Sequence, residues 1–561
     1  MPGDLFTVRF VPDGRVCQST GPIDLYLAAA AAGILVEQPC GGQATCGRCR
    51  VRVIEGAAAP GEADREQLTP SELALGWRLG CQLTITADAS IEIPPVVRSL
   101  AGKSFGDALP AASLDGPDAA SRTLSPEDEE LLPASLARGR PRLGLAIDIG
   151  TTSLAVGLID LGDGGVVASA SCLNPQVALG ADVIARIKHS MDHADGTERL
   201  AQAVRDGLAD LVGQLLGDAG CDGQDVVTAA VAGNPTMIQA WAGVPVAGLG
   251  TAPYAAAWSS EQHWRAADVG LPVHPGGSVY VFPMVRSHVG GDAVAAAVAS
   301  GFDLGRASRL LIDLGTNCEV MVASGERVVA TSAAAGPAFE GVSIRCGMRA
   351  APGAIDVVSL HPSGEVRFHT VGGLRAAGLC GSALIDLVAE LLRVGVLARS
   401  GYLRKAHELP ADGRPFAPRL AEVDGQTAFC VASAGEGASR EIVLTARDVR
   451  ELQLAKGSTL AAITLACGSL GIDPLDLQEV LVAGAFGNFL RKASVARMRL
   501  VPAVAAERVR FVGNAAGVGA RLALLDSRVR ARARAFARRA EYLDLATHRD
   551  YQDTFMNTLA F

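Results

Sequence analysis

The sequence predicts two domains of different fold class, a small α+β domain followed by a larger α/β domain that contains one strand–turn–strand module twice. Three observations support this prediction. Three cysteines lie within residues 40–49, between short stretches with the alternation of β-strands. Two apolar stretches, 143–160 and 310–323, share a strand, an Asp-x-Gly-Thr turn and a returning strand. A proline-punctuated stretch, 95–141, separates the two parts.

Length and charge limit the class of protein. A chain of 561 residues exceeds the size of a single hydrophobic core, which rarely grows beyond about 250–300 residues. The formal net charge of −9 argues against a nucleic-acid partner, which would require a strongly basic face. No uncharged apolar run of about 18 residues or more predicts a membrane span, and the first residues lack a secretory signal pattern. We therefore expect a cytoplasmic protein.

The cysteines of the first domain predict an iron–sulfur site. Cys40, Cys46 and Cys49 are followed, after a helical interval, by Cys81, a C-x5-C-x2-C…C spacing close to that of plant-type [2Fe–2S] proteins. Glycines in this loop would let the backbone wrap around a cluster and bring N–H groups near its sulfur atoms. Zinc is one alternative, although zinc sites usually use two short ligand pairs. Disulfides are another, and they require an oxidising compartment.

The elements around the cysteine loop predict the fold of residues 1–94. We expect a hairpin over 5–10 and 15–19, a helix over 24–32, a strand over 50–54 and closing strands over 84–93. This arrangement resembles a ferredoxin of the β-grasp type.

The linker, 95–141, is predicted to hold one short helix that begins at Ser125 as N-cap with Pro126 in the first position. A semi-rigid tether of about 45 residues could present the cluster to more than one place, or it could simply separate two fused domains.

The two Asp-x-Gly-Thr turns predict phosphate binding. Backbone N–H groups and hydroxyls in such turns can donate to phosphate oxygens, and the leading carboxylates, Asp148 and Asp313, can hold Mg²⁺ or orient a water molecule. The predicted phosphate contacts are Gly150, Thr151, Thr152 and Ser153 in the first turn and Gly315, Thr316 and Asn317 in the second.

A second pair of related segments, 231–236 and 482–488, follows the same order. Its later member contains a glycine-rich strand-to-helix turn, predicted to approach adenosine, that consists of Gly484, Ala485, Phe486 and Gly487. No P-loop sequence is present. We therefore expect ATP with Mg²⁺ between a first half, 142–305, and a longer second half, 306–561, that carries a C-terminal helix and tail.

These motifs resemble those of acetate kinase, sugar kinases, actin and the heat-shock ATPases, where they are the phosphate-1, phosphate-2 and adenosine motifs. The resemblance implies a duplicated α/β ribonuclease-H-like fold.

The order of ferredoxin, linker and ATPase resembles the reductive activators of corrinoid-dependent enzymes. Further segments that carry this resemblance are 174–176, 180–184, 233–237, 289–292, 336–341, 347–350, 381–383, 455–456 and 512–514. The resemblance implies ATP-dependent transfer of one electron to cob(II)alamin of a corrinoid protein, which restores cob(I)alamin for a methyltransferase, and implies an upstream electron donor. Two departures are Cys318, where relatives often have glycine, and a linker too short for the extra middle domain of many relatives.

Other features have competing interpretations. The arginines of 528–539 are interpreted as a solvated helix face, with an acidic docking partner as the alternative. The tail, 542–561, is expected to pack on the core or on a second copy in a homodimer. His189 and His193 share the spacing of a zinc pair but lack a third ligand; they and His288 are expected to be structural, and Arg286 and Glu340 to line the cleft.

Three other functions remain open at this point. A small-molecule kinase with a redox-sensing cluster would respond to a sugar or an acid. An ATP-dependent reductase could serve another low-potential enzyme. A nucleotide-gated scaffold would leave the cluster unexplained.

Overall fold

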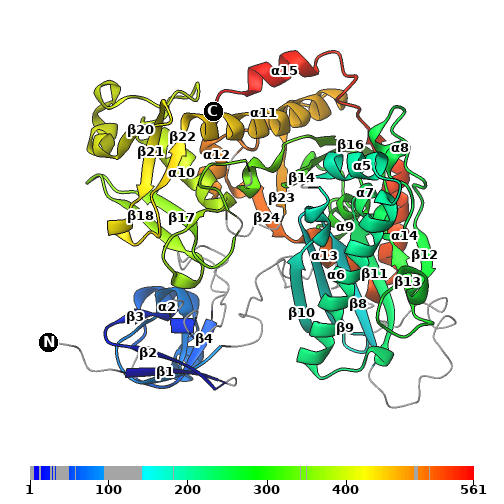
Figure 1. The fold of residues 1–561 in the computed structure, drawn as a ribbon, viewed down its shortest axis with the longest axis horizontal. Helices are drawn as coiled ribbons and strands as arrows, with labels where there is room; N and C mark the ends of the chain where they lie inside the picture. Colours follow the sequence, from blue (N-terminus) through cyan, green and yellow to red (C-terminus); the bar gives the residue numbers. More distant parts are fainter. Residues whose placement is uncertain are drawn as a thin grey trace.

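The computed structural model describes residues 6–11, 14–25, 28–29, 32, 50–56, 59–93, 142–180, 182–341, 343–348, 350–484, 490–504 and 506–561. The loop with Cys40, Cys46 and Cys49, the linker with its predicted helix, and Ala485, Phe486 and Gly487 lie outside these residues. Figure 1 shows the first domain in blue and the larger domain in cyan to red.

The first domain is built on a five-stranded sheet with the order β2-β1-β7-β4-β5. The strands are β1 (Phe6–Val11), β2 (Arg15–Ser19), β4 (Arg50–Glu55), β5 (Trp77–Leu79) and β7 (Ala89–Glu92), with helices α2 (Glu62–Gln67) and α3 (Pro70–Ala74) between β4 and β5. Alternate residues of β1 are buried with Leu25 and Ala28, which lie inside the predicted helix. The hairpin of β1 and β2 and the mixed sheet agree with the β-grasp prediction.

The first half of the larger domain contains a six-stranded sheet with the order β10-β9-β8-β11-β13-β12. Its strands are β8 (Leu143–Ile149), β9 (Ser153–Asp160), β10 (Val166–Leu173), β11 (Val226–Gly233), β12 (Gln262–Arg265) and β13 (Ser278–Val281). β8, β9 and β10 are antiparallel neighbours, whereas β11 and β13 run parallel to β8. The long helix α6 (Gly196–Ala219) covers one face with a stripe of buried leucines and valines.

The second half repeats this topology in the sheet β24-β23-β14-β15-β16-β25. Its strands are β14 (Arg309–Asp313), β15 (Cys318–Ser324), β16 (Arg327–Ala333), β23 (Glu479–Ala483), β24 (Val509–Gly513) and β25 (Glu541–Tyr542). Again three antiparallel strands are followed by two parallel ones on the other side of the first strand. This repeated order confirms the duplicated ribonuclease-H-like fold.

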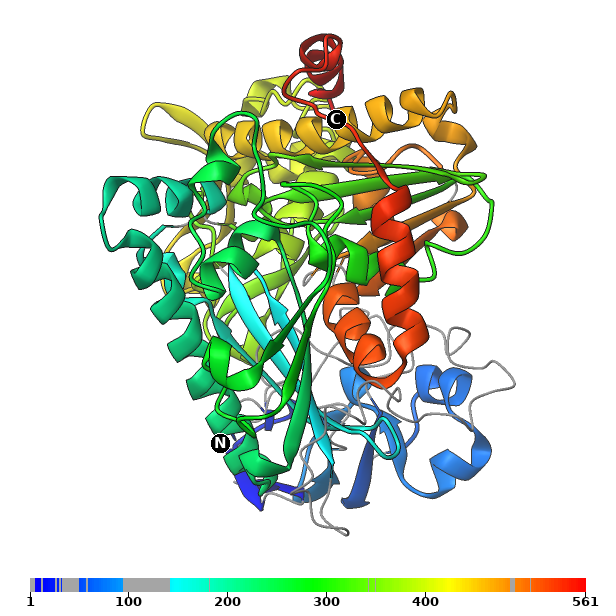
Figure 2. The ribbon, with the colours of Figure 1, turned by 90° about the vertical axis from the view of Figure 1, so that its right-hand side faces the viewer.

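The greater length of the second half comes from an insertion between β16 and β23. The insertion forms two three-stranded sheets together with α10 (Gly381–Arg393) and α11 (Ala446–Ser469); the strands are β17 (Ala354–Leu360), β18 (Val366–Thr370), β19 (Gly378–Leu379), β20 (Leu420–Val423), β21 (Gln426–Ala432) and β22 (Ile442–Thr445). Figure 2 shows α11 in gold across the top of the molecule, with α15 (Tyr551–Thr558) above it.

The two halves meet through helices α9 (Gly291–Ala299) and α13 (Ala515–Leu525), which occupy matching places after β13 and β24. Both helices are rich in buried alanine. A Cβ atom at Gly519 would lie 2.3 Å from the Ala295 carbonyl oxygen, so the helices cross at backbone contact. The core between the halves combines these small residues with larger side chains such as Phe282, Phe302 and Phe536.

The basic helix α14 (Ser527–Arg539) is a solvated face in part, as expected, because Arg528, Arg534, Arg538 and Arg539 are exposed. Arg532 bonds Asp303 and Arg534 bonds Glu261, both in the first half, while Arg530 is buried over the ring of Tyr280. Part of the positive charge that a docking surface would need is therefore paired within the chain. These partners lie far away in the sequence, which is why the local pattern did not indicate them.

The C-terminal tail packs on the core of its own chain. The Phe561 side chain is 1% exposed and lies among residues of α10, α11 and the segment 490–500. Lys456 of α11, fully buried, donates from Nζ to the carbonyl oxygens of Thr558, at 2.6 Å, and Ala560. Burial lowers the pKa of Lys456 to about 8.

Among the described residues, no helix is both long enough and apolar enough to cross a membrane.

Candidate functional site

The first Asp-x-Gly-Thr turn, called the first phosphate turn because phosphate binding is predicted for it, connects β8 to β9 at the edge where β8 and β11 end together. Asp148, 1% exposed, is the second-last residue of β8 and pairs in register with Ala232 of β11. The Gly150 N–H donates to the Ser153 carbonyl at 3.0 Å and closes the turn. Thr151 and Thr152 occupy its tip, as predicted from the Asp-x-Gly-Thr pattern.

Three carbonyl groups of this turn accept hydrogen bonds from Asn174 and Arg186. The Asn174 side chain donates to the Gly150 carbonyl at 2.9 Å, and its backbone N–H donates to the Thr152 carbonyl at 3.0 Å. The carbonyl between them, that of Thr151, accepts from the guanidinium of Arg186 at 2.5 Å. With three consecutive carbonyl oxygens engaged, the groups left for a ligand are donors, and this suits an anion.

Arg186 lies on α5 (Val183–Asp192) and is completely buried. It also donates to the Gly180 carbonyl at 2.9 Å and to the Gln176 side-chain oxygen at 3.0 Å. A buried guanidinium within hydrogen-bonding distance of the first turn supplies positive charge where phosphate is predicted to bind.

Asn234 orients the first threonine of the turn. Its side-chain oxygen accepts from the Met237 N–H at 3.0 Å and caps α7 (Pro235–Trp241), so its amide nitrogen points to the Thr151 hydroxyl oxygen at 2.9 Å. The Thr151 oxygen is thus an acceptor here, which leaves its proton available to a ligand.

The second turn faces the first across a single carboxylate. Glu340 follows β16 in the short helix η7 (Pro337–Glu340). Its Oε2 accepts from the Thr152 hydroxyl at 2.7 Å, and its Oε1 accepts from the Thr316 N–H at 3.0 Å and from the Thr316 hydroxyl. The turns are therefore close enough to grip one ligand between them.

Acidic groups gather beside the second turn. Asp313 ends β14 and pairs in register with Glu319 of β15. Burial, followed by the negative charges of Asp292 and Asp313, raises the pKa of the Glu319 carboxyl well above its usual range. Within the described ranges, no three His, Cys, Asp or Glu groups are close enough to hold a metal ion. Mg²⁺ held by Asp148 and Asp313 would therefore take other ligands from water and phosphate, as this ion commonly does.

Gly484, the first residue of the predicted adenosine turn, meets the second phosphate turn directly. Its φ is +115°, and a Cβ atom would lie 2.5 Å from the Leu314 carbonyl oxygen, so a larger residue would not fit. Gly233 at the end of β11 has the matching place in the first half, where a Cβ atom would lie 2.9 Å from the Ile149 carbonyl oxygen. The remaining residues of the adenosine turn lie outside the described residues.

Cys318 follows the second turn and is fully buried. Burial raises the pKa of its thiol, and a hydrogen bond from Thr459 of α11 opposes this shift. The Cys318 thiol therefore packs against α11.

Of the four predicted cluster ligands, only the backbone of Cys81 lies in the described part of the first domain. β4 starts at Arg50, directly after the cysteine loop, and pairs Arg50 with Leu79. Leu79 is two residues before Cys81, whose backbone belongs to the short helix η1 (Gly80–Gln82). The register therefore places the backbone of Cys81 near Arg50, the residue that follows Cys49 in the sequence. The positions of the four sulfur atoms remain a prediction.

His189, His193 and His288 make contacts within the chain. The rings of His189 and His193 stack at 4.3 Å, and His193 Nδ1 lies 3.0 Å from the His189 carbonyl oxygen. His288 is placed 3.4 Å from the Tyr542 hydroxyl, and Arg286 forms a β-bridge with Val289.

Sequence reasoning assigned no role to Asn174, Arg186 or Asn234, although Asn174 and Asn234 lie in segments that carried the family resemblance. Asparagine followed by proline after a strand, as at 174–175 and 234–235, is the signal that could have indicated them. Arg186 had no such signal, because its bond to the first turn crosses between distant segments.

Comparisons with known proteins extend this description to most of the chain. Three family models match: "2Fe-2S iron-sulfur cluster binding domain" over residues 12–86, "RACo middle region" over 143–305 and "C-terminal domain of RACo the ASKHA domain" over 307–561. The segment predicted as the first ATPase half is thus the one that the family description calls the middle region.

Two curated relatives are similar over most of their length. The chain is 33% identical over 424 residues to the "Corrinoid activation enzyme RamQ" of Eubacterium limosum, an alignment of 75% of this chain and 71% of that protein. It is 24% identical over 426 residues to the "[Co(II) methylated amine-specific corrinoid protein] reductase" of Methanosarcina barkeri, with 69% and 71% aligned.

A solved structure, "Reductive activator for corrinoid,iron-sulfur protein", matches with a TM-score of 0.70 and 30% identity over 99% of this chain and 98% of that chain. The chain therefore belongs to the family of reductive activators of corrinoid proteins, in which an iron–sulfur domain is joined to an ATPase of the actin and sugar-kinase fold.

Proposed function

We propose that this protein reactivates a corrinoid protein by ATP-dependent reduction of cob(II)alamin to cob(I)alamin, the state that a methyltransferase uses. The observation that carries the proposal is the pair of opposed phosphate turns, linked by Glu340, in a chain that also has a ferredoxin domain. Its partners are a corrinoid protein and an upstream electron donor, and we place the reaction in the cytoplasm.

The need for ATP follows from reduction potentials. A plant-type cluster has a potential near −400 mV, and cob(II)alamin in such systems is expected to be harder to reduce. Each ~59 mV costs a factor of ten for one electron, so a gap of about 100–200 mV costs roughly 2–5 kcal/mol. Binding or hydrolysis of ATP can offset a deficit of this size.

The chain's residues divide this work between the two domains. Cys40, Cys46, Cys49 and Cys81 would hold the [2Fe–2S] cluster, which supplies the low-potential electron when bound. Asp148 and Asp313 would hold Mg²⁺. Phosphate oxygens would be bound by Gly150, Thr151, Thr152, Ser153, Gly315, Thr316 and Asn317, and adenosine by Gly484, Ala485, Phe486 and Gly487.

Asn174 and Arg186 would keep the first turn in its anion-binding shape, since they engage its carbonyl groups. The buried charge of Arg186 would further favour the triphosphate. Asn234 would keep the Thr151 hydroxyl proton directed to the ligand.

The test is an anaerobic reaction of the reduced protein with MgATP and a candidate cob(II)alamin protein. We expect the cob(I)alamin spectrum to appear only with ATP. Asp313→Ala should abolish ATP turnover and leave the visible absorption of the cluster intact. ATP turnover that rises with a sugar or an acid, and not with any corrinoid protein, would favour the kinase alternative and refute the proposal.

A further inference from the structure

Glu340 takes the hydrogen-bond donors that both phosphate turns are predicted to offer to ATP. The Thr152 hydroxyl, the Thr316 N–H and the Thr316 hydroxyl all donate to its two carboxylate oxygens. Thr316 is 8% exposed, so its bonds to Glu340 are largely shielded from water, whereas Thr152 and Glu340 are half-buried. The carboxylate thus occupies the position in the hydrogen-bond network that a phosphate oxygen would take.

A phosphate group and this carboxylate cannot use the same donors. Each threonine hydroxyl has one proton, and a proton donated to Glu340 is not available to a second acceptor. A phosphate that approached the same threonines would also be repelled by the negative charge of the Glu340 carboxylate. Thr151 differs, because its oxygen accepts from Asn234 and its own proton is not used in that bond.

We propose that Glu340 is a positioning residue that holds the two turns together, and that the triphosphate of MgATP binds by displacing its carboxylate. This inference rests on the proposed nucleotide site and adds to it a direct competition between the phosphates and a residue of the chain.

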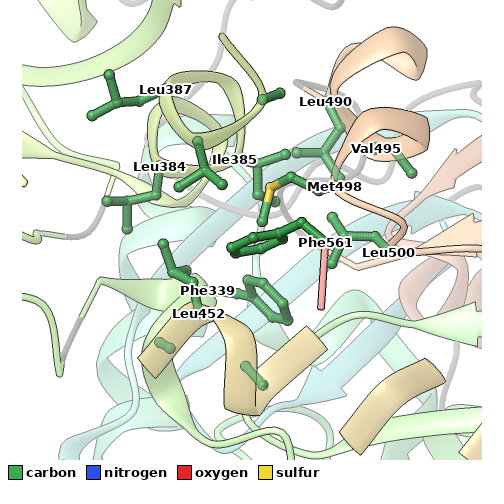
Figure 3. Close-up of a cluster of buried hydrophobic side chains, with 14 of the residues drawn as sticks. Phe339, Leu384, Ile385, Leu387, Leu452, Leu490, Val495, Met498, Leu500 and Phe561 are labelled. Atoms are coloured by element: carbon green, nitrogen blue, oxygen red, sulfur yellow. The ribbon is translucent and has the colours of Figure 1, made fainter. Parts of the chain in front are cut away.

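The segment that carries Glu340 connects the displacement of its carboxylate to the insertion between β16 and β23. Gly336 and Gly341, at its two ends, have φ values of +75° and +77°, and the Gly336 N–H donates to the Thr316 carbonyl at 3.0 Å. The neighbouring Phe339 is 1% exposed, and Figure 3 shows it in the cluster that contains Leu384, Leu452 and Phe561. Displacement of Glu340 would therefore act on the packing of α10, α11 and the tail.

The test compares the affinities of MgATP, MgADP and adenosine for wild-type protein and Glu340→Gln by calorimetry, with the cluster in place. Glutamine removes the negative charge and weakens the competing acceptor. One charged hydrogen bond corresponds to about a tenfold change in affinity. We expect MgATP to bind about tenfold more tightly to the variant, MgADP less so, and adenosine with unchanged affinity.

The matched control is Glu326→Gln, which changes a carboxylate of the same half whose side chain is 78% exposed and pairs with Arg306. It should leave all three affinities unchanged. Glu340→Asp keeps the charge but is too short to span both turns; we expect about a threefold gain for MgATP, and this variant provides the test if Glu340→Gln does not fold.

The outcomes separate the two proposals. An unchanged or weaker MgATP affinity in Glu340→Gln refutes the displacement, as does an equal change for adenosine, which would indicate a general effect on the fold. Wild-type protein that binds none of the nucleotides refutes the ATP site itself.

Discussion

Replacement of Arg186 by methionine tests the support of the first phosphate turn. Methionine has a similar length and suits a buried site, but it cannot donate a hydrogen bond. The variant therefore removes the bonds to the carbonyl oxygens of Thr151 and Gly180, at 2.5 and 2.9 Å, with little change in packing volume. It also removes the bond to the Gln176 side-chain oxygen, which keeps the Asn174 amide as a donor at 3.4 Å.

The expected loss of stability follows from the two carbonyl oxygens, of Thr151 and Gly180, that lose their donor. A buried carbonyl left without its donor costs about 1–3 kcal/mol, so the two together lower the free energy of unfolding by roughly 2–6 kcal/mol. The Thr151 carbonyl lies in the turn that is predicted to bind phosphate. If about 1.4 kcal/mol is needed to restore the turn for binding, MgATP affinity falls tenfold.

Urea unfolding measures the first quantity and calorimetric titration with MgATP the second, while the cluster's visible absorption reports on the ferredoxin domain. The control is Lys188→Met on the same helix, where the side chain is 73% exposed and pairs with Asp192; it should cost only about 0.3–0.5 kcal/mol. An Arg186→Met protein with wild-type ATP affinity, and with a stability loss no larger than that of the control, would contradict this reasoning.

Three further predictions concern the cluster, the tail and a buried lysine. Cys46→Ser should remove the [2Fe–2S] absorption but leave MgATP affinity unchanged; loss of both would count against separate domains. Phe561→Ala should lower the free energy of unfolding by about 3–5 kcal/mol in urea titrations, because the ring is 1% exposed, and a loss under about 1 kcal/mol would argue against its buried position. Since the pKa of Lys456 is lowered from 10.5 to about 8, the unfolded chain binds more protons than the folded chain between these pH values. Stability of the wild type relative to Lys456→Met should therefore rise by up to about 3 kcal/mol from pH 8 to 10.5, and parallel curves would exclude this.

The duplicated fold could be predicted because each module is encoded locally. A strand, an Asp-x-Gly-Thr turn and a returning strand lie close together in the chain, and their repetition indicated two related halves before any contact was known. The cysteine spacing is equally local, and it indicated the ferredoxin domain.

Contacts between distant segments could not be predicted in the same way. The hydrogen bonds of Glu340 join residues of both halves, and the hydrogen bond of Arg186 joins helix α5 to the first turn. No local pattern in the sequence encodes either contact. The arginines of α14 illustrate the same limit, because their partners Asp303 and Glu261 belong to the other half.

The crossing of α9 and α13 has a mechanical consequence. Where Gly519 rests on the backbone of the opposite helix, no side chain of the described residues stands between the two halves. The axis of any opening between the two turns is then expected to run through this crossing. Gly519→Leu would force the two helices apart at this crossing and should weaken nucleotide binding, even though residue 519 lies outside both turns.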